Sequence, residues 1–490
     1  MNAPERRWPA VNVPARHFIG NRFVEPGDGR SLPMIDPSDG AAFAAIARGN
    51  AADVDAAVRA AQGACGGAWG KLAPAERGRR LAALSRAIAE HADELALLEA
   101  RDCGKPLAQA RADAAACARY FEFYAGACDK LHGTTIPYAD GYSVLTWREP
   151  HGVTGHVIPW NYPLQIFGRS AGGALAAGNA CVVKPAEDAC LSLLRVAELA
   201  AASGLPGGAL NVVTGLGAEA GAALVAHAGV AHLSFTGSPE TGASVAAIAA
   251  RRHCPVTLEL GGKSPQIVFA DADVDTAVPA IVNAIVQNAG QTCSAGSRLL
   301  VERPLYEPLL ALLGERFSRL VAAPALADRD CGPLIRASQL ARVHAFLDRA
   351  RRSGVEAVAA GQVAADAPAG GYYVAPVLLR DVPPDDPLAC NEVFGPVLAA
   401  MPFDDEGHAI ALANASDYGL AAGVWTRDGA RQLRMARALQ SGQVFVNNYG
   451  AGGGVELPFG GVKHSGYGRE KGFEALHGFT TLKTVVLRHG

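Results

Sequence analysis

The stretch Val153-Thr154-Gly155-His156-Val157-Ile158 decides the fold, because it begins a regular alternation of short β runs with Ala- and Leu-rich helical segments. The later β runs cover residues 180–184, 210–213 and 232–235. This alternation predicts an α/β fold in which parallel strands are joined by helices that cover both faces of the sheet. Before this stretch, apolar residues recur at helical intervals from Asn50 to Glu122, and Pro74 is suited to the first turn of one of these helices.

A second α/β series follows the glycine pair Gly261-Gly262. It opens with a β run at residues 266–269 and continues to about Val446, so we place the main domain boundary at the two glycines. Residues 130–150 and 478–490 contain β material outside both series. The tail from Phe479 to Leu487 is rich in β-branched residues, and an exposed strand of this kind is normally covered by a partner. A frayed terminus is the alternative.

Composition excludes several classes of protein. The chain has 490 residues, 50% hydrophobic and 19% charged, with a formal net charge of -3, which indicates a compact soluble protein without a basic surface for nucleic acid. Neither a signal peptide nor a membrane span is credible, so we expect a cytoplasmic location and no membrane partner. The ten cysteines include no Cys-x-x-Cys pair and no Cys/His cluster with metal-ligand spacing, which argues against a metal site and a disulfide scaffold.

Three residues suggest covalent chemistry at a carbonyl carbon. Cys293, in Gln291-Thr292-Cys293-Ser294, offers a thiol nucleophile, and Glu259, in Leu258-Glu259-Leu260-Gly261-Gly262-Lys263, offers a carboxylate that can activate water. Asn161, in Ile158-Pro159-Trp160-Asn161-Tyr162-Pro163, offers an amide donor directly after a strand. A lone cysteine is usually a small buried hydrophobe, so the hypothesis depends on the three residues together.

Together with Lys184-Pro185-Ala186-Glu187, these segments resemble the NAD(P)-dependent aldehyde dehydrogenase superfamily, from about Arg16 to Lys483. The resemblance implies a Rossmann-type NAD-binding domain from residues 1–129 and 151–261 and an α/β catalytic domain from residues 262–461. It also implies a β oligomerisation hairpin from residues 130–150 and 478–490, and therefore a homodimer or homotetramer.

The resemblance also implies a mechanism. Cys293 adds to the aldehyde carbon, the oxyanion rests on Asn161 and the Cys293 amide, hydride leaves to NAD, and Glu259 activates the water that hydrolyses the thioester. Relatives that pass the acyl group to coenzyme A lack this carboxylate, so hydrolysis is expected. An unperturbed thiol has a pKa of about 8.5, so some local activation of Cys293 is expected.

The expected cofactor site gathers at strand ends. Gly237 and Ser238 follow a β run and precede Pro239, which leaves backbone N–H groups for a phosphate, although a simple capped helix has the same pattern. Lys184 and Glu187 are suited to ribose hydroxyls, and Glu187 favours NAD over NADP because a carboxylate repels a 2′-phosphate. The full expected set is Ile158, Pro159, Trp160, Lys184, Glu187, Gly217, Phe235, Gly237, Ser238, Leu260, Glu392 and Phe394.

Two glycine motifs are weaker signals. Gly215-Leu216-Gly217 begins like a dinucleotide fingerprint, but its last glycine, Gly221, comes one place late. Gly262-Lys263-Ser264 resembles the end of a phosphate loop, but Thr257 stands where that loop requires its first glycine.

The expected substrate residues are Arg169, Tyr162 and Gln287. Arg169 resembles the arginine by which succinate-semialdehyde dehydrogenases are expected to clamp a distal carboxylate. The likeness is partial, because Gln287 and the segment Gly452-Gly453-Gly454 stand where those enzymes have a second arginine and a serine. We therefore expect a polar or acidic aldehyde bulkier than the four-carbon semialdehyde. If Arg169 is instead a salt-bridged helix residue that points elsewhere, a neutral aromatic or amino-aldehyde is the next hypothesis.

Three other functions use part of the same residues. A cysteine esterase or hydrolase would need Cys293 and Asn161 but neither Glu187 nor Glu392. A coenzyme A-acylating enzyme would need a thiol acceptor in place of water. A non-catalytic role is disfavoured because all three chemical groups are present.

Overall fold

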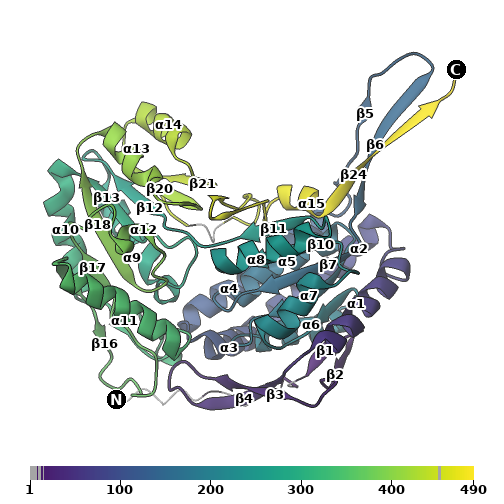
Figure 1. Cartoon of the computed structure of the whole chain (residues 1–490), viewed down its shortest axis with the longest axis horizontal. Coiled ribbons are helices and arrows are strands. Elements are labelled where there is room, and N and C mark those ends of the chain that lie inside the picture. The colour runs from purple at the N-terminus through teal and green to yellow at the C-terminus, as the bar shows by residue number, and fades with distance from the viewer. Residues whose placement is uncertain (1–7, 9–12, 15, 451–453) are drawn as a thin grey trace.

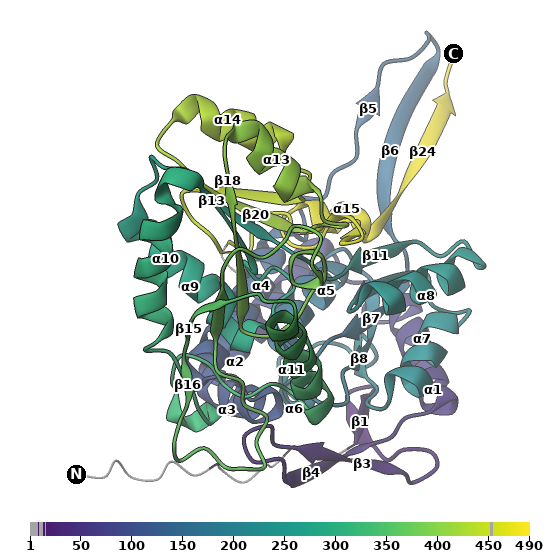
Figure 2. The same ribbon diagram turned by 60° about the vertical axis from the view of Figure 1, so that its left-hand side comes forward.

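The computed structural model describes residues 8, 13–14, 16–450 and 454–490. Two mainly parallel sheets, each packed against helices, lie side by side, and a three-stranded sheet projects away from them (Figures 1 and 2). This arrangement confirms the predicted α/β fold class. No helix among the described residues combines the length and apolar composition that crossing a bilayer requires.

The first sheet has eight strands in the order β2-β1-β9-β8-β7-β10-β11-β23. In that order their bounds are Arg22–Val24, His17–Ile19, Leu210–Val212, Ala180–Pro185, Val153–Ile158, His232–Thr236, Val256–Glu259 and Gly466–Tyr467. The run from β9 to β11 is parallel and almost continuously buried, as a sheet covered by helices requires. The helices of this half are α1 Ala51–Gly66, α2 Pro74–Glu90, α3 Ala92–Cys103, α4 Leu107–Ala127, α5 Pro163–Ala176, α6 Leu191–Ala202, α7 Ala222–Ala226 and α8 Pro239–Ala250.

The strand order changes direction between β7 and β10. The chain runs outward from β7 through β8 to β9, then returns to place β10 and β11 on the other side of β7. Open α/β sheets bind ligands in the crevice at the carboxyl ends of the strands where the order reverses. The segments after β7 and β10 are therefore placed for a ligand.

The second sheet has seven strands in the order β15-β17-β18-β13-β12-β20-β21. Their bounds, in that order, are Ala357–Ala360, Val377–Leu379, Val397–Phe403, Arg298–Glu302, Pro265–Val268, Ala421–Trp425 and Gln443–Val446. Its helices are α9 Val274–Val286, α10 Arg303–Phe317, α11 Ala337–Arg352, α12 Pro387–Cys390, α13 Glu406–Asn414 and α14 Gly429–Ala438. Three smaller pairs are β3 Ser31–Ile35 with β4 Ala42–Ala47, β14 Val321–Ala322 with β16 Gln362–Val363, and β19 Tyr418–Gly419 with β22 Val462–Lys463.

A tight turn separates α9 from the segment that leads to β13. Asn288, Ala289 and Gly290 have φ angles of 49°, 54° and 73°, three consecutive residues in the left-handed region. A Cβ on Gly290 would lie 2.2 Å from the carbonyl oxygen of Gly395, so only glycine fits there. Such strain is often found at functional sites, and Cys293 comes three residues after Gly290.

The tail strand β24 (Thr480–Arg488) pairs antiparallel with β6 (Tyr142–Pro150) along its whole length, and β5 (Thr135–Ile136) lies on the other side of β6. Figures 1 and 2 show this sheet standing clear of the body beyond the short helix α15 (Glu474–Gly478). The pairing excludes the frayed-terminus alternative. Large apolar side chains are exposed on this sheet, among them Tyr142, Trp147, Leu482 and Val486.

Candidate functional site

The carboxyl end of the first sheet faces the amino end of the second, and two cavities meet at Cys293. One is a groove of about 280 Å³ along the ends of β7, β10 and β11. The other is a narrow tunnel of about 60 Å³ beside α5 and α9. Cys293 lines both, so its thiol can contact molecules that enter from either side.

Most of the predicted cofactor residues line the groove. They are Pro159, Trp160, Gly237, Ser238, Leu260, Glu392 and Phe394, joined by Asn161 and Glu259 from the predicted catalytic set. Ser238 caps α8, because its Oγ accepts a hydrogen bond of 3.3 Å from the Thr241 N–H. Ile158 and Phe235 are buried at the ends of β7 and β10 and are not among the groove's lining residues.

Lys184, Glu187 and Gly217 form a separate group at the end of β8, the neighbour of β7. Lys184 Nζ lies 2.8 Å from Glu187 Oε2. Burial alone would raise the pKa of Glu187, but Lys184 and the Gly217 N–H outweigh it and hold the pKa below its ordinary value. Glu187 is therefore a carboxylate at neutral pH, ready to accept hydrogen bonds from hydroxyl groups.

Helix α11 and the residue before it add groove residues that the motifs missed: Arg336 at the N-cap, and Gln339 and Arg342 in the helix. Arg336 Nη1 lies 3.1 Å from Asp188 Oδ2. Asp188 follows β8 of the first sheet, so this ion pair connects the two halves of the molecule. Arg342 Nη2 donates to the Glu392 carbonyl over 2.7 Å. Only the packing of the two halves brings this helix to the groove, and no local motif marks it.

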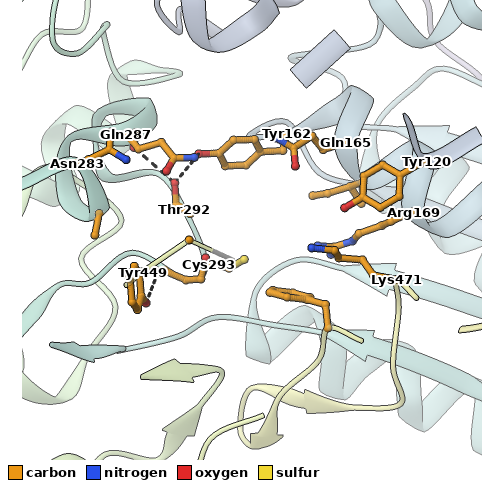
Figure 3. A pocket seen from close by; sticks show the side chains of 15 residues that line it. Tyr120, Tyr162, Gln165, Arg169, Asn283, Gln287, Thr292, Cys293, Tyr449 and Lys471 are labelled. Atoms are coloured by element: carbon orange, nitrogen blue, oxygen red, sulfur yellow. Dashed lines mark hydrogen bonds between the residues drawn. The ribbon is translucent and has the colours of Figure 1, made fainter. Parts of the chain in front are cut away.

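The tunnel contains all three predicted substrate residues, Arg169, Tyr162 and Gln287 (Figure 3). Sequence reasoning missed several others that line it: Tyr120, Gln165, Asn283, Tyr449, Phe459 and Lys471. Figure 3 shows Arg169 and Lys471 extending into the tunnel from the side opposite Tyr449. The glycine segment predicted to open the tunnel wall includes Gly452 and Gly453, which lie outside the described residues.

Arg169 lines the tunnel, as predicted for a substrate residue, and it is also salt-bridged, as the alternative prediction held. Its Nε lies 2.5 Å from Glu470 Oε2, and both side chains are buried, so it is salt-bridged. It nevertheless lines the tunnel, and its guanidinium lies 4.8 Å from the centre of the Phe459 ring. Nη2 makes a long contact of 3.4 Å with Thr236, and Nη1 has no hydrogen bond to any described residue. The Nε side of the guanidinium is therefore paired, and Nη1 remains available.

Tyr162 connects the tunnel wall to the nucleophile loop. Its hydroxyl receives a hydrogen bond of 2.8 Å from Gln287 Nε2 and makes another of 2.8 Å with Thr292 Oγ1. Lys105 Nζ lies 4.4 Å from the centre of the Tyr162 ring.

A buried charge cluster supports the start of α5. Lys105 Nζ lies 2.7 Å from Glu99 Oε1 and 2.5 Å from Asp113 Oδ2. Glu99 Oε2 accepts the Leu164 N–H over 3.0 Å, and Asp113 accepts from Gln165 of the tunnel wall. These bonds fix the segment that carries Asn161 and Tyr162.

Asn161 has the donor that an oxyanion needs. Its Nδ2 donates one N–H to the Gln291 carbonyl over 3.1 Å. An amide nitrogen has two N–H groups, so a second donor remains beside Cys293. Asn288 Nδ2 also donates to the Asn161 carbonyl over 3.0 Å, which ties the left-handed turn to this loop.

The expected activation of the thiol is wrong for this structure. Burial raises the pKa of Cys293 to about 12, and Arg169 opposes this effect only in part. Sequence alone could not reveal this, because the burial of the thiol and its distance from charged groups depend on how the chain packs. The thiol needs a change in its surroundings, or a general base, before it attacks carbon.

Glu259 has the environment of a general base. Both carboxyl oxygens are buried and have no hydrogen-bond partner among the described residues. Burial raises its pKa well above the ordinary value. A carboxylate with a raised pKa accepts a proton from water more readily, because catalysis by a base is most effective when its pKa approaches the working pH.

Gly262→Ala is expected to damage both stability and activity. A Cβ there would lie 2.2 Å from the Cys293 carbonyl oxygen, so the nucleophile loop must move. We expect a loss of roughly 1–3 kcal/mol in the free energy of unfolding, measured by denaturant titration, with a fall in turnover. Gly63→Ala in α1 is the matched control, because no atom lies within 4 Å of its Cβ; equal losses in the two variants would contradict the packing argument.

Comparison with known proteins gives matches across the whole chain. The aldehyde dehydrogenase family model matches residues 23–485. Hydroxyisobutyraldehyde dehydrogenase of Mycolicibacterium austroafricanum is 41% identical over 474 residues, which cover 96% of this chain and 94% of that protein. A crystal structure of a Burkholderia cenocepacia protein assigned as an aldehyde dehydrogenase is 67% identical with a TM-score of 0.97, covering 97% of this chain and 100% of that one. The NAD+ complex of an aldehyde dehydrogenase from Bacillus cereus is 38% identical with a TM-score of 0.95 and covers 98% of each chain.

Proposed function

Because the chain belongs to the aldehyde dehydrogenase family, we propose that it oxidises a polar or acidic aldehyde to the carboxylic acid through a thioester on Cys293. The protein is an oxidoreductase that acts on aldehydes, and NAD is its cofactor. The observation that carries the proposal is the position of Cys293, which lines the groove and the tunnel at once.

The groove fits the cofactor by its place and its chemistry. It lies at the carboxyl ends of β7 and β10, where the strand order reverses. We propose that Lys184 and Glu187 hold a ribose and that Glu392 and Phe394 lie at the nicotinamide end. NAD, when bound, accepts the hydride that leaves the aldehyde carbon. Glu187 favours NAD over NADP because a carboxylate at a ribose 2′ position repels a phosphate.

The protein's own groups account for the remaining steps. The Cys293 thiolate forms a bond to the aldehyde carbon, and the carbonyl electron pair moves to oxygen, where Asn161 Nδ2 and the Cys293 N–H stabilise the charge. After oxidation the carbon is a thioester. Glu259 removes a proton from water as the water attacks, the carbon–sulfur bond breaks, and the thiolate is regenerated with the acid released.

The proposed substrate class follows from the tunnel. Nη1 of Arg169 has no hydrogen-bond partner among the described residues, and Lys471 lies on the same wall. Guanidinium N–H groups bind carboxylates and other acceptors strongly. The narrow volume of about 60 Å³ favours an extended aldehyde with its polar end on this wall.

Arg169→Leu tests the substrate class. We expect kcat/KM for succinate semialdehyde to fall by about 10- to 100-fold, because a hydrogen bond to a charged group contributes roughly 1.5–3 kcal/mol. The value for butanal, which lacks the distal carboxylate, should change far less. Steady-state kinetics on the two aldehydes measure this, and an equal loss on both would reject a clamp by Arg169.

A specific observation supports a second substrate class. Four aromatic rings line the tunnel, those of Tyr120, Tyr162, Tyr449 and Phe459. Flat apolar walls suit an aromatic aldehyde, and ring faces attract the cation of an amino-aldehyde. Higher kcat/KM for benzaldehyde or an amino-aldehyde than for succinate semialdehyde would favour this class.

Three further properties of the protein are predicted from the sequence. The first is the division into an NAD-binding domain and a catalytic domain at Gly261-Gly262, which the two separate sheets support. The second is a homodimer or homotetramer built on the hairpin, supported by the open edge of β24 and its exposed apolar side chains. The third is a cytoplasmic location.

A further inference from the structure

Glu470 lies at the end of a buried chain of hydrogen bonds that begins beneath the first sheet. Its Oε1 accepts from Ser234 Oγ over 2.5 Å, and Ser234 accepts from Ser170 Oγ over 2.9 Å. Ser170 Oγ lies 2.6 Å from His156 Nδ1, and His156 Nε2 lies 2.8 Å from Thr154 Oγ1. The other carboxylate oxygen, Oε2, accepts from Arg169 Nε.

These bonds connect His156 to Glu470 through two serine hydroxyls. Burial lowers the pKa of His156 to about 3, so its ring is neutral and has one N–H. Because Ser170 donates to Ser234, it accepts from the Nδ1–H of His156, and the other ring nitrogen accepts from Thr154. In this arrangement the donors point toward Glu470, and both of its carboxyl oxygens accept hydrogen bonds.

Glu470 pairs with Arg169, a cation that acts on both reacting groups. Arg169 lowers the pKa of the Cys293 thiol and of the Glu259 carboxyl, whereas Glu470 raises the pKa of Glu259. Arg169 also lines the tunnel, with Lys471 beside it. Glu470 is the ion-pair partner of Arg169, so its charge bears on the field that Arg169 exerts on the tunnel and on Cys293.

We propose that Glu470 is a positioning and specificity-determining residue, which holds Arg169 against the tunnel wall and compensates its charge. A substrate in the tunnel then meets the N–H groups of the Arg169 guanidinium, held in a fixed direction, and a smaller net positive charge. The tunnel therefore accepts aldehydes with neutral hydrogen-bonding ends as well as anionic ones. The lower positive charge also leaves the Cys293 thiol less readily deprotonated. The substrate part of this inference rests on the proposed function, while the thiol part does not.

Glu470→Gln tests the compensation while keeping the hydrogen-bond chain possible. The amide oxygen can accept from Arg169, and its N–H₂ can donate to Ser234, after which the chain reverses through the other tautomer of His156. We expect iodoacetamide to alkylate Cys293 about tenfold faster at pH 8, which corresponds to a thiol pKa lower by about one unit. We also expect the ratio of kcat/KM for succinate semialdehyde to that for butanal to rise about tenfold.

Two further variants complete the experiment. Glu474→Gln makes the same chemical change at an exposed position on α15 and should alter neither readout. Arg169→Met/Glu470→Gln removes both charges, so alkylation should return to the wild-type rate or below it. If Glu470→Gln does not fold, Glu470→Asp withdraws the carboxylate from Arg169 by one methylene and should move both readouts in the same direction by less.

Unchanged alkylation, or an unchanged substrate ratio, in a folded Glu470 variant overturns the proposal. If the wild-type protein oxidises neither aldehyde, the proposed substrate class fails, and the alkylation rate alone decides the role of Glu470. If oxidation proceeds and neither readout moves, only the role of Glu470 fails.

Discussion

Cys293→Ala is expected to abolish aldehyde oxidation while NAD still binds. The groove loses one sulfur atom but keeps its other lining groups, whereas the aldehyde carbon loses its only nucleophile among the residues that line both cavities. Removing the nucleophile of a covalent enzyme typically lowers turnover by about 10⁴-fold or more. Steady-state formation of reduced nicotinamide measures the first effect, and titration calorimetry with NAD measures the second.

Cys390→Ala is the matched control for this experiment. Cys390 is also a partly exposed free cysteine, but it lines neither cavity. Its replacement should leave turnover close to the wild-type value. Substantial residual oxidation by Cys293→Ala would reject Cys293 as the nucleophile, and a matching loss in Cys390→Ala would show that the assay responds to general damage.

Glu259→Gln is expected to separate oxidation from hydrolysis. The amide cannot take a proton from water, so the thioester should persist after one turnover. We expect a single burst of reduced nicotinamide of about one equivalent per site, followed by a steady-state rate lower by roughly 10²- to 10⁴-fold. Rapid-mixing absorbance measures both phases, and mass spectrometry of the trapped protein should show the acyl group on Cys293.

The same variant distinguishes two roles for Glu259. If its main task is to remove the proton of the Cys293 thiol, whose pKa is raised to about 12, the burst itself should slow. If it acts on water, the burst rate is retained. An unaltered steady state would contradict both roles.

Much of the fold was predictable because the signal is local. The β runs from Val153 to Phe235 alternate with helices, and the structure places β7, β8, β9 and β10 on them with ends that differ by at most one residue. Pro74 starts α2 as predicted, because a proline in the first turn removes an N–H that has no partner in any case. These features depend on neighbouring residues, so a single sequence suffices to find them.

The site was predictable only where a motif contains the chemistry. Cys293, Glu259 and Asn161 stand in recognisable segments, and the structure brings them to one groove. The residues of α11 and the pair of Glu470 with Arg169 have no such signal, since the two members of that pair are 301 positions apart. The thiol activation was wrong for the same reason, because the burial that raises the pKa of Cys293 is a property of the packed molecule.

The segment that joins β11 to β12, residues 260–264, limits which positions can be varied when the enzyme is engineered. A Cβ on Gly261 would lie 2.5 Å from Glu392 Oε2, and one on Gly262 would meet the Cys293 carbonyl oxygen at 2.2 Å. A mutant library designed for bulkier aldehydes should therefore leave these two codons unchanged. The library should instead vary Asn283 and Tyr449, whose side chains line the tunnel from other segments. Substitutions there alter the shape of the tunnel without disturbing the segment between β11 and β12.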